Sequence, residues 1–367
     1  MKIAYVTDAV YPYHKGGKEV RLYEISKRLA INHEVHIYSM KWWKGSDNII
    51  KDKVHFHAVC KLYKLYTPSG RRSIFEGIMF GLNCLRINVK EYDIVDVDHM
   101  PFFPLFSMKL KCFFSRKKMH ATWHEVWGKD YWKEYLGWKG IFGYWIEKMA
   151  IKMPDKIISI SKHTTSRLIN NFKISKNKIH TVPCGVDYEK IIKIKPSAEK
   201  SDVIFAGRLL KHKNVDILIK AVSLIKKPIK CIIIGDGPEL ENLKELTHKL
   251  GLDKKIIFKG FVKDKETVFA LMKSSKVFVF PSSREGFGIV VLEANACGLP
   301  VITVNEKDNA AKELINGKNG FICKLTEKEI AENVINSLNK KDWKTKEYVR
   351  EYDWDLINTS LVKKYGI

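Results

Sequence analysis

The feature that most constrains this chain is a strand and helix rhythm that runs through the sequence twice. In the first half, short apolar runs are separated by segments such as residues 19–30, where Val20, Leu22, Ile25 and Leu29 recur at helical spacing. The runs span residues 2–7, 33–39, 54–59, 94–97, 120–123 and 156–160. Such alternation predicts parallel strands joined by helical crossovers that cover both faces of a sheet.

The rhythm restarts after Asp187, so we expect two sheets. The second set of apolar runs spans residues 202–205, 230–234, 256–258, 277–280 and 300–303. Residues 183–200, with Gly185 and Pro196, form the expected linker, because backbone breakers gather there. A chain of 367 residues can build two cores. We predict an α/β protein with Rossmann-like domains at 1–184 and 185–349, and a terminal helix at about 350–367 that packs back on the first domain.

Composition excludes several classes of protein. A hydrophobic content of 45% with 29% charged residues is typical of a globular chain. The first residues run directly into an apolar strand rather than a targeting segment, and the most apolar stretch, 101–114, is interrupted by Lys109 and Lys111. The seven cysteines include no C-x-x-C pair, so neither a zinc site nor a disulfide framework is expected. These features predict a cytoplasmic protein with reduced cysteines.

The formal net charge of +24 is uneven, because residues 1–184 carry +16 and the remainder +8. A basic field attracts polyanions, whether nucleic acid, anionic lipid or phosphorylated substrates. Solvated lysines on exposed faces explain the same composition equally well.

A glycine-rich turn in residues 281–302 is the most informative segment. Glu285 lies in this turn, and Gly286 and Gly288 open the following helix. Small residues let the first amides of a helix approach a phosphate, and the helix dipole favours its charge. Glu293 lies about one and a half turns further along, where a carboxylate can accept hydrogen bonds from a ribose diol. This segment predicts a seat for a nucleoside diphosphate.

Positive charge for that diphosphate is available in residues 207–214, which follow a predicted strand. Arg208 and Lys213 stand at the carboxyl end of the strand, where open α/β sheets bind ligands. Both cations bind phosphate oxygens, the arginine as a bidentate donor. We expect the neighbouring Lys211 and His212 to be exposed loop residues.

Taken in order, the motifs resemble those of the retaining glycosyltransferases of family 4 (glycosyl transferases group 1), which adopt the GT-B fold. The matching segments are the Gly16-Gly17 loop, Thr122-Trp123-His124-Glu125, residues 183–187, Arg208 with Lys213, residues 235–239, and Glu285 with seven residues before Glu293. The resemblance implies two Rossmann-like domains that face a central cleft. It also implies an enzyme of class EC 2.4.

The resemblance also assigns roles to residues. Arg208 and Lys213 would bind the donor diphosphate, Glu293 the ribose and Glu285 the transferred sugar. The remaining implied donor-binding residues fall into three pairs: Gly16 and Gly17; Phe261 and Val262, which would face the base; and Phe287 and Gly288, which would offer their backbone amides. His124, at the end of a first-domain strand, would lie beside the sugar and the reacting carbon.

The implied reaction retains the configuration at the anomeric carbon, with fixed positive groups stabilising the departing diphosphate. The donor would be a UDP- or GDP-sugar, with no other cofactor. Asp96-Val97-Asp98 is similar to a metal-binding aspartate pair of another glycosyltransferase fold, but it ends a first-domain strand, so we predict no metal.

The acceptor is expected on the first domain and to be a glycan, a glycolipid or a lipid-linked sugar. Residues 102–119 and 127–145 mix aromatic with basic side chains, which favours a surface at the inner face of an anionic membrane, although core helices give the same composition. Two other functions remain open: a basic nucleic-acid-binding protein, which no binding motif supports, and a same-fold epimerase or phosphorylase. The sequence leaves the sugar, the base, the acceptor and the oligomeric state open.

Overall fold

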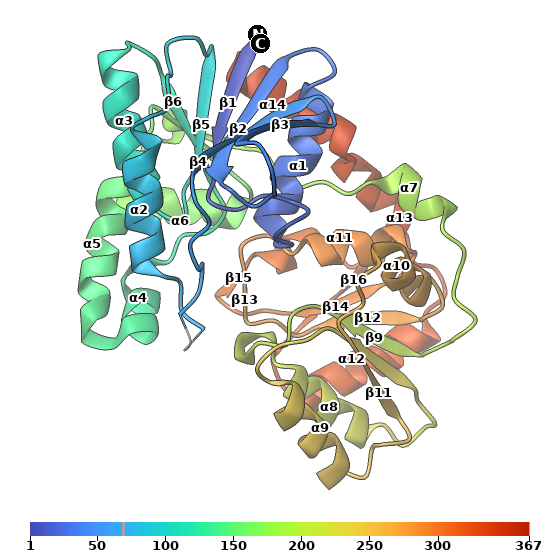
Figure 1. The fold of residues 1–367 in the computed structure, drawn as a ribbon. Coiled ribbons are helices and arrows are strands. Elements are labelled where there is room, and N and C mark those ends of the chain that lie inside the picture. Colours follow the sequence, from blue (N-terminus) through green and yellow to red (C-terminus); the bar gives the residue numbers. More distant parts are fainter. Residues whose placement is uncertain (68–69, 367) are drawn as a thin grey trace. The chain divides into compact units, whose positions relative to one another are not determined.

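The computed structural model describes residues 1–67 and 70–366, which form two compact α/β units. Unit 1 comprises Met1–Pro183 with Ile357–Ile367, and unit 2 comprises Cys184–Leu356 (Figure 1). The last helix, α14 (Trp354–Tyr365), therefore begins in unit 2 and continues in unit 1.

Unit 1 is built on an eight-stranded sheet in the order β3-β4-β2-β1-β5-β6-β7-β8. All its strand pairs are parallel except β3 with β4. Its strands are β1 (Lys2–Val6), β2 (Glu34–Met40), β3 (Asn48–Lys51), β4 (Val54–Cys60), β5 (Ile94–Asp98), β6 (Met119–Trp123), β7 (Lys156–Ser159) and β8 (Ile179–Thr181). Its other helices are α1 (Gly17–Leu29), α2 (Ile74–Cys84), α3 (Phe103–Phe114), α4 (Gly128–Leu136), α5 (Gly140–Ala150) and α6 (Lys162–Phe172).

The two faces of this sheet differ because successive side chains of a strand point to opposite sides. Ala4 and Val6 of β1 join the apolar core beneath α2 and α3. Tyr5 faces the other side, where its hydroxyl accepts a hydrogen bond from Tyr365 of α14 at 3.2 Å. The last helix, α14, thus packs on this face of the first sheet.

Unit 2 is built on a six-stranded parallel sheet in the order β11-β10-β9-β12-β14-β16. The strands are β9 (Val203–Ala206), β10 (Cys231–Ile234), β11 (Ile256–Gly260), β12 (Val277–Phe280), β14 (Val301–Val304) and β16 (Gly320–Cys323), with a small pair β13 (Arg284–Glu285) and β15 (Asp308–Asn309). The helices are α7 (Tyr188–Lys193), α8 (Val215–Leu224), α9 (Leu240–Lys249), α10 (Lys265–Lys273), α11 (Ile289–Ala296), α12 (Glu327–Asn339) and α13 (Thr345–Val349). Helix α8 packs against α9 and α12, and α11 contacts α7, α10 and α13 (Figure 1).

The sequence pattern predicted most of these strands and missed the weakest. It did not predict β3, β8, β16 or the two-residue strands β13 and β15. The expected linker at residues 183–200 contains the short helix α7. The seven cysteines are free, and six of them are buried. Of the helices in the described part of the chain, none combines the length and the apolar character needed to cross a bilayer.

Candidate active site

The candidate donor site of unit 2 lies where the strand order of its sheet reverses. The chain adds β10 and β11 on one side of β9, and then β12, β14 and β16 on the other, so β9 and β12 are neighbours that begin opposite halves. In open parallel sheets, the carboxyl ends of such strands flank a ligand-binding crevice. Arg208 and Lys213 follow β9, and Glu285 follows β12.

The two loops at this position are joined by hydrogen bonds. The backbone N–H of Ser283 donates to the carbonyl of His212 at 2.9 Å, and the Nδ2 of Asn214 donates to the carbonyl of Pro281 at 3.0 Å. Lys213 Nζ forms an ion pair with Glu285 Oε1, and both side chains are mostly buried. Lys213 Nζ also lies 5.0 Å from the centre of the Phe280 ring. The structure therefore brings together Lys213 and Glu285, two of the residues that the sequence predicted to bind the donor.

His212 was expected to be an exposed loop residue, and that expectation was wrong. Its side chain is half-buried, and burial followed by the charge of Lys213 lowers its pKa to about 4. Its carbonyl also accepts hydrogen bonds from the hydroxyls of Ser282 and Ser283. His212 helps to hold the two loops together, whereas Lys211 is exposed as predicted.

A close approach of glycines supports the loop that carries Arg208. Gly235 has φ +140, and a Cβ there would lie 1.8 Å from the carbonyl oxygen of Gly207. The Gly207 N–H donates to the carbonyl of Ile234 at 3.0 Å, and the Leu209 N–H donates to the carbonyl of Asp236 at 2.9 Å. The Gly235-Asp236-Gly237 segment, which the sequence identified only as a motif, thus fixes the path of the loop. Arg208 itself is exposed.

The start of α11 is the position at which the sequence predicted a phosphate seat. Gly288 is the N-cap residue, has φ +92 and supplies no side-chain cap. A Cβ at this position would lie 2.6 Å from the Cβ of Ala311, so glycine is required. Phe287, just before it, is buried against Tyr352 with ring centres 6.4 Å apart. A helix start of this kind presents backbone donors to an anion.

Glu293 is engaged by a lysine that the sequence did not reveal. Its Oε1 lies 2.6 Å from Nζ of Lys265, the first residue of α10. The carboxylate is mostly buried while the lysine is exposed, so the lysine can move away at low cost. Phe261, which follows β11, is also exposed, and Val262 is half-buried.

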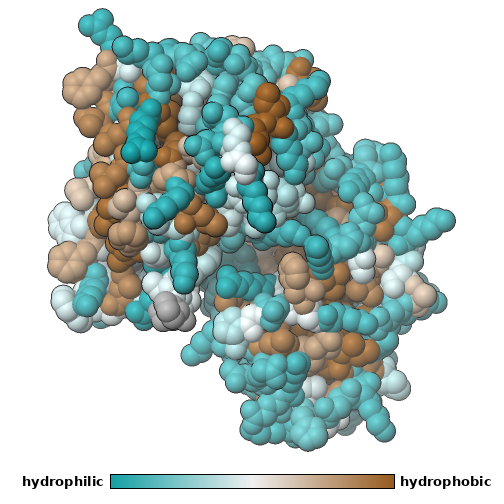
Figure 2. All heavy atoms as spheres, in the orientation of Figure 1, coloured by the Kyte–Doolittle hydropathy of each residue, from teal (hydrophilic) through white to brown (hydrophobic). Residues whose placement is uncertain are grey.

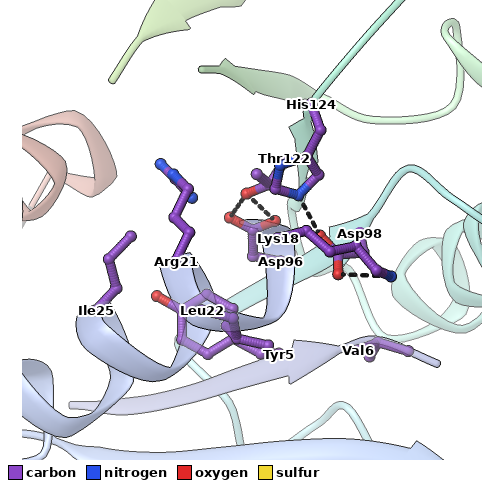
Figure 3. Close-up of a pocket in the computed structure, with 10 residues that line it drawn as sticks. All are labelled: Tyr5, Val6, Lys18, Arg21, Leu22, Ile25, Asp96, Asp98, Thr122 and His124. Atoms are coloured by element: carbon purple, nitrogen blue, oxygen red, sulfur yellow. Dashed lines mark hydrogen bonds and ion pairs between the residues drawn. The ribbon is translucent and has the colours of Figure 1, made fainter. Parts of the chain in front are cut away.

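Unit 1 contains a second polar cluster at the corresponding reversal of its own sheet, between β1 and β5. Lys18 of α1 lies between two strand-end aspartates, with Nζ 2.5 Å from Asp8 Oδ1 and 3.4 Å from Asp98 Oδ2. Asp98 also contacts His124 Nε2 at 2.8 Å (Figure 3). It accepts a further hydrogen bond from the Thr7 hydroxyl at 2.5 Å. Gly16 and Gly17, at the start of α1, directly precede Lys18.

The charges of this cluster stabilise one another. Burial alone would raise the pKa of Asp98, but Lys18 and His124 outweigh it and hold that pKa well below its ordinary value. Burial likewise opposes the charge on Lys18, and Asp8 and Asp98 outweigh it and raise the pKa of that lysine. Asp98 therefore stays ionised, and its carboxylate fixes the Nε2 edge of the His124 ring.

Asp8 extends the cluster to α2. Its second oxygen forms an ion pair with Arg72 Nη2, which also lies 3.3 Å from Glu76 Oε2. Glu76 is fully buried, and burial together with the charge of Asp8 raises its pKa to about 7. Neither Lys18 nor Arg72 was singled out in the sequence. Lys18 directly precedes the predicted helical segment at residues 19–30, whereas no predicted element begins or ends at Arg72.

Asp96 and Asp98, the pair similar to a metal motif, point to different partners. Asp96 accepts hydrogen bonds from the hydroxyls of Thr122 at 3.0 Å and Tyr365 at 2.5 Å, and burial raises its pKa to about 6. Both aspartates line a small cavity of about 10 Å³ beside Arg21 (Figure 3). Among residues 1–67 and 70–366, no group of three or more His, Cys, Asp or Glu side chains is positioned to hold a metal.

Comparisons with known proteins cover most of the chain. The family model described as Glycosyltransferase Family 4 matches residues 15–190, and the model described as Glycosyl transferases group 1 matches residues 187–353. The chain is 30% identical over 238 residues to an uncharacterized glycosyltransferase of Methanocaldococcus jannaschii, with 58% of this chain and 60% of the relative covered.

Two further similarities concern named ligands. The chain is 29% identical over 194 residues to the N-acetylgalactosamine-N,N'-diacetylbacillosaminyl-diphospho-undecaprenol 4-alpha-N-acetylgalactosaminyltransferase of Campylobacter jejuni, with 51% of this chain and 52% of the relative covered. The match thus spans between half and two thirds of the length of these two curated relatives. A crystal structure of the Anabaena protein HepE in complex with UDP-glucose superposes with a TM-score of 0.76 at 19% identity, covering 100% of this chain and 99% of that one. This likeness confirms the predicted fold class.

Proposed function

Because the chain belongs to the glycosyltransferases of family 4 and group 1, enzymes of class EC 2.4, we propose that it transfers a sugar from a nucleoside diphosphate sugar with retention at the anomeric carbon. The observation that carries the proposal is the ion pair of Lys213 with Glu285 at the β9–β12 reversal, next to the uncapped start of α11. A cation, a carboxylate and helix amides are the groups that a sugar diphosphate requires.

In the proposed reaction, the bond between the anomeric carbon and the diphosphate oxygen breaks, and the electron pair leaves with the nucleoside diphosphate. The acceptor oxygen forms the new bond to that carbon, and its proton passes to an oxygen of the departing diphosphate. Lys213 and Arg208 stabilise the charge that develops on the leaving group, together with the first amides of α11. Glu285 binds a hydroxyl of the transferred sugar. The ribose diol displaces Lys265 and donates hydrogen bonds to the carboxylate of Glu293.

His124 is proposed to contact the reacting sugar from unit 1. Its Nε2 edge is held by Asp98, so the opposite edge of the ring is the one available to a substrate hydroxyl. The contact of Asp98 with Lys18 makes this orientation independent of pH near neutrality, because the carboxylate stays ionised. Asp98 is therefore a positioning residue in this proposal.

The donor is proposed to be a UDP- or GDP-sugar. The similarity to HepE, whose structure contains UDP-glucose, supports UDP. The reaction is proposed to need no metal, since Arg208, Lys213 and the α11 amides already supply positive charge to the diphosphate. Undiminished transfer in EDTA is the expected result, and activity that depends on added Mg²⁺ or Mn²⁺ would contradict it.

The acceptor is proposed to be a lipid-linked or other glycan sugar that binds to unit 1. The relative from Campylobacter jejuni is named for a diphospho-undecaprenol substrate, which supports a lipid-linked acceptor. The family match favours transfer over the epimerase and phosphorylase alternatives. A nucleic-acid-binding role has no support beyond the net charge of +24.

Unit 1 is also proposed to contact an anionic membrane through α2, α3 and α5. Apolar side chains gather over these helices (Figure 2), and the exposed ones include Phe75, Leu82, Phe113, Phe114 and Trp145. Among the described residues of the three helices, both carboxylates, Glu76 and Glu147, are buried. Exposed apolar residues with lysines and without exposed acids are suited to an anionic lipid surface. Co-sedimentation with anionic vesicles that is lost in Phe113→Asp is expected; no binding at low salt would contradict it.

The proposed function is tested by donor screening followed by product analysis. Thermal unfolding with a panel of UDP- and GDP-sugars identifies the nucleotide, since a ligand at a hundredfold excess over its Kd adds about 2.7 kcal/mol. The identified donor is then used in the transfer reaction, and NMR gives the anomeric configuration of the product. This configuration is expected to match that of the donor. Stabilisation by no nucleotide sugar, or a product of inverted configuration, would contradict the proposal. Glu285→Ala is expected to abolish transfer while the protein still binds free UDP or GDP.

A further inference from the structure

We propose that an apolar cavity in unit 1 binds the first carbons of the hydrocarbon chain of a lipid phosphate, which presents its sugar as the acceptor. The cavity measures about 360 Å³ and lies among α4, α5 and the start of α3. Phe103, Trp127, Trp132, Tyr135, Phe142 and Ile146 form its apolar walls. The inference rests on the proposed function, because it names the acceptor of the same reaction.

Hydrogen bonds and close packing hold the walls of the cavity in place. The buried carboxylate of Glu147 accepts hydrogen bonds from the backbone N–H of Trp127 at 2.7 Å and from Trp132 Nε1 at 2.9 Å. Gly143 lets α5 approach the indole of Trp132, since a Cβ there would lie 2.2 Å from the ring. Two of the aromatic walls are thus fixed by a single side chain of α5.

The charge at the cavity distinguishes a lipid phosphate from a neutral apolar ligand. Its charged lining residues, Arg72 and Lys139, are both cations. Among the described residues, both carboxylates that contact Arg72 do so through Nη2, and a guanidinium has five N–H donors, so further donors can face a phosphate. Apolar walls with a cationic rim match a hydrocarbon chain that ends in a phosphate.

The size and the mouth of the cavity match the same ligand. A volume of 360 Å³ holds about a dozen carbon-sized groups if each occupies about 30 Å³, the share of a water molecule in the liquid. Ile74, Trp138 and Phe142 at the mouth are largely exposed. A water-soluble sugar phosphate would gain nothing from these side chains, whereas a chain that continues into a membrane would remain in contact with apolar surface.

Arg72 connects the cavity to the polar cluster at the end of β1. Arg72 contacts Asp8, Asp8 contacts Lys18, and Lys18 contacts Asp98, which holds His124. A phosphate at the cationic rim would therefore leave its sugar on the side of unit 1 where the predicted reacting groups lie. This continuity favours the acceptor over an unrelated lipid.

Titration calorimetry with geranyl phosphate, without detergent, tests the inference. Geraniol and inorganic phosphate are the comparison ligands, because they separate the chain from the phosphate. We expect saturable binding of geranyl phosphate, weaker binding of geraniol and none of phosphate. Phe142→Asp, at an exposed cavity position, is expected to lower the affinity for geranyl phosphate at least tenfold. Lys139→Gln is expected to lower the affinity for geranyl phosphate but not that for geraniol.

The matched control is Phe113→Asp in α3, since Phe113 is 71% exposed, Phe142 is 62% exposed, and Phe113 is not part of the cavity wall. It should bind geranyl phosphate as the wild type does while losing vesicle binding. An equal loss of geranyl phosphate binding in Phe142→Asp and Phe113→Asp would assign the effect to the whole apolar face and overturn the inference. A dimer that Phe142→Asp dissociates, with no ligand binding in the wild type, would assign the cavity to a second copy of the chain. Nucleotide-sugar binding, measured by thermal unfolding in the same variants, fails only if the proposed function itself fails.

Discussion

Lys213 and Glu285 lie 72 residues apart in the sequence and form an ion pair between the loops that follow β9 and β12. The two loops come from opposite halves of the sheet, so the pair exists only because the strand order reverses between them. In the proposed complex, the lysine turns to the diphosphate and the carboxylate to the sugar. The pair keeps both side chains at the site before the donor arrives.

Replacing Lys213 should therefore remove charge stabilisation without unfolding the protein. Lys213→Ala is expected to lower kcat/KM about 10²- to 10³-fold, the usual effect of losing one group that stabilises a leaving charge. Lys211→Ala, an exposed neighbour in the same loop, is the matched control and should keep full activity. Steady-state kinetics together with circular dichroism measure both properties. Full activity of Lys213→Ala would remove this residue from the mechanism.

The pair of Glu293 with Lys265 makes opposite predictions for its two members. Glu293→Gln is expected to lower the affinity for the nucleotide sugar about tenfold or more, because a charged hydrogen bond to the ribose is lost. Lys265→Ala removes the side chain that competes with the ribose, so affinity should stay the same or increase. Calorimetric titration of both variants distinguishes the roles. Equal weakening by both would indicate that the ion pair, rather than the carboxylate, supports the site.

Asp98 is expected to act through His124. Asp98→Asn keeps the size of the side chain but removes the charge that His124 and Lys18 face. We expect kcat to fall about 10- to 100-fold with little change in the KM for the donor, and His124→Ala to have a similar effect. Because the carboxylate of Asp98 stays ionised near neutral pH in the wild type, its own protonation should not change the wild-type kcat in that range. An unchanged kcat in Asp98→Asn would make Asp98 a structural residue.

His120 provides a test of stability against pH. Burial, followed by the charge of His180, lowers its pKa to about 4, while the unfolded chain titrates near 6.5. As pH falls from 6.5 to 4, the unfolded state binds a proton that the folded state does not, so the free energy of unfolding decreases. His120→Phe keeps a ring to pack against Tyr365 and removes this titration.

We compare the free energies of unfolding of His120→Phe and the wild type. When the pH is lowered from 7.5 to 4.5, this difference should change by about 1–3 kcal/mol in favour of His120→Phe. Urea unfolding at both pH values measures the shift. The buried acids Glu76, Asp96 and Glu147, whose pKa values are raised, affect both proteins equally and cancel in the difference. A stability difference between His120→Phe and the wild type that is the same at both pH values would contradict this account.

The sequence predicted those parts of the fold in which continuous apolar runs dominate. The buried parallel strands such as Cys231–Ile234 have such runs, whereas β3 is an edge strand with only two apolar residues and β8 has only three residues. Arg208, Lys213 and Glu285 could be proposed because short motifs at strand ends carry them. Lys18, Arg72 and Lys265 could not, since each is defined by a partner distant in the sequence, as Arg72 is by Asp8 across 64 residues. Lysines and arginines are common on protein surfaces, so only the structure selects these three.

A crystal structure of the protein with its nucleotide sugar tests the central claim most directly. The account predicts the diphosphate at the start of α11, within hydrogen-bond distance of Lys213 Nζ and of the Gly288 amide, with the ribose on Glu293 and Lys265 displaced. A diphosphate bound elsewhere on unit 2, with the ion pair of Lys213 and Glu285 intact, would contradict it.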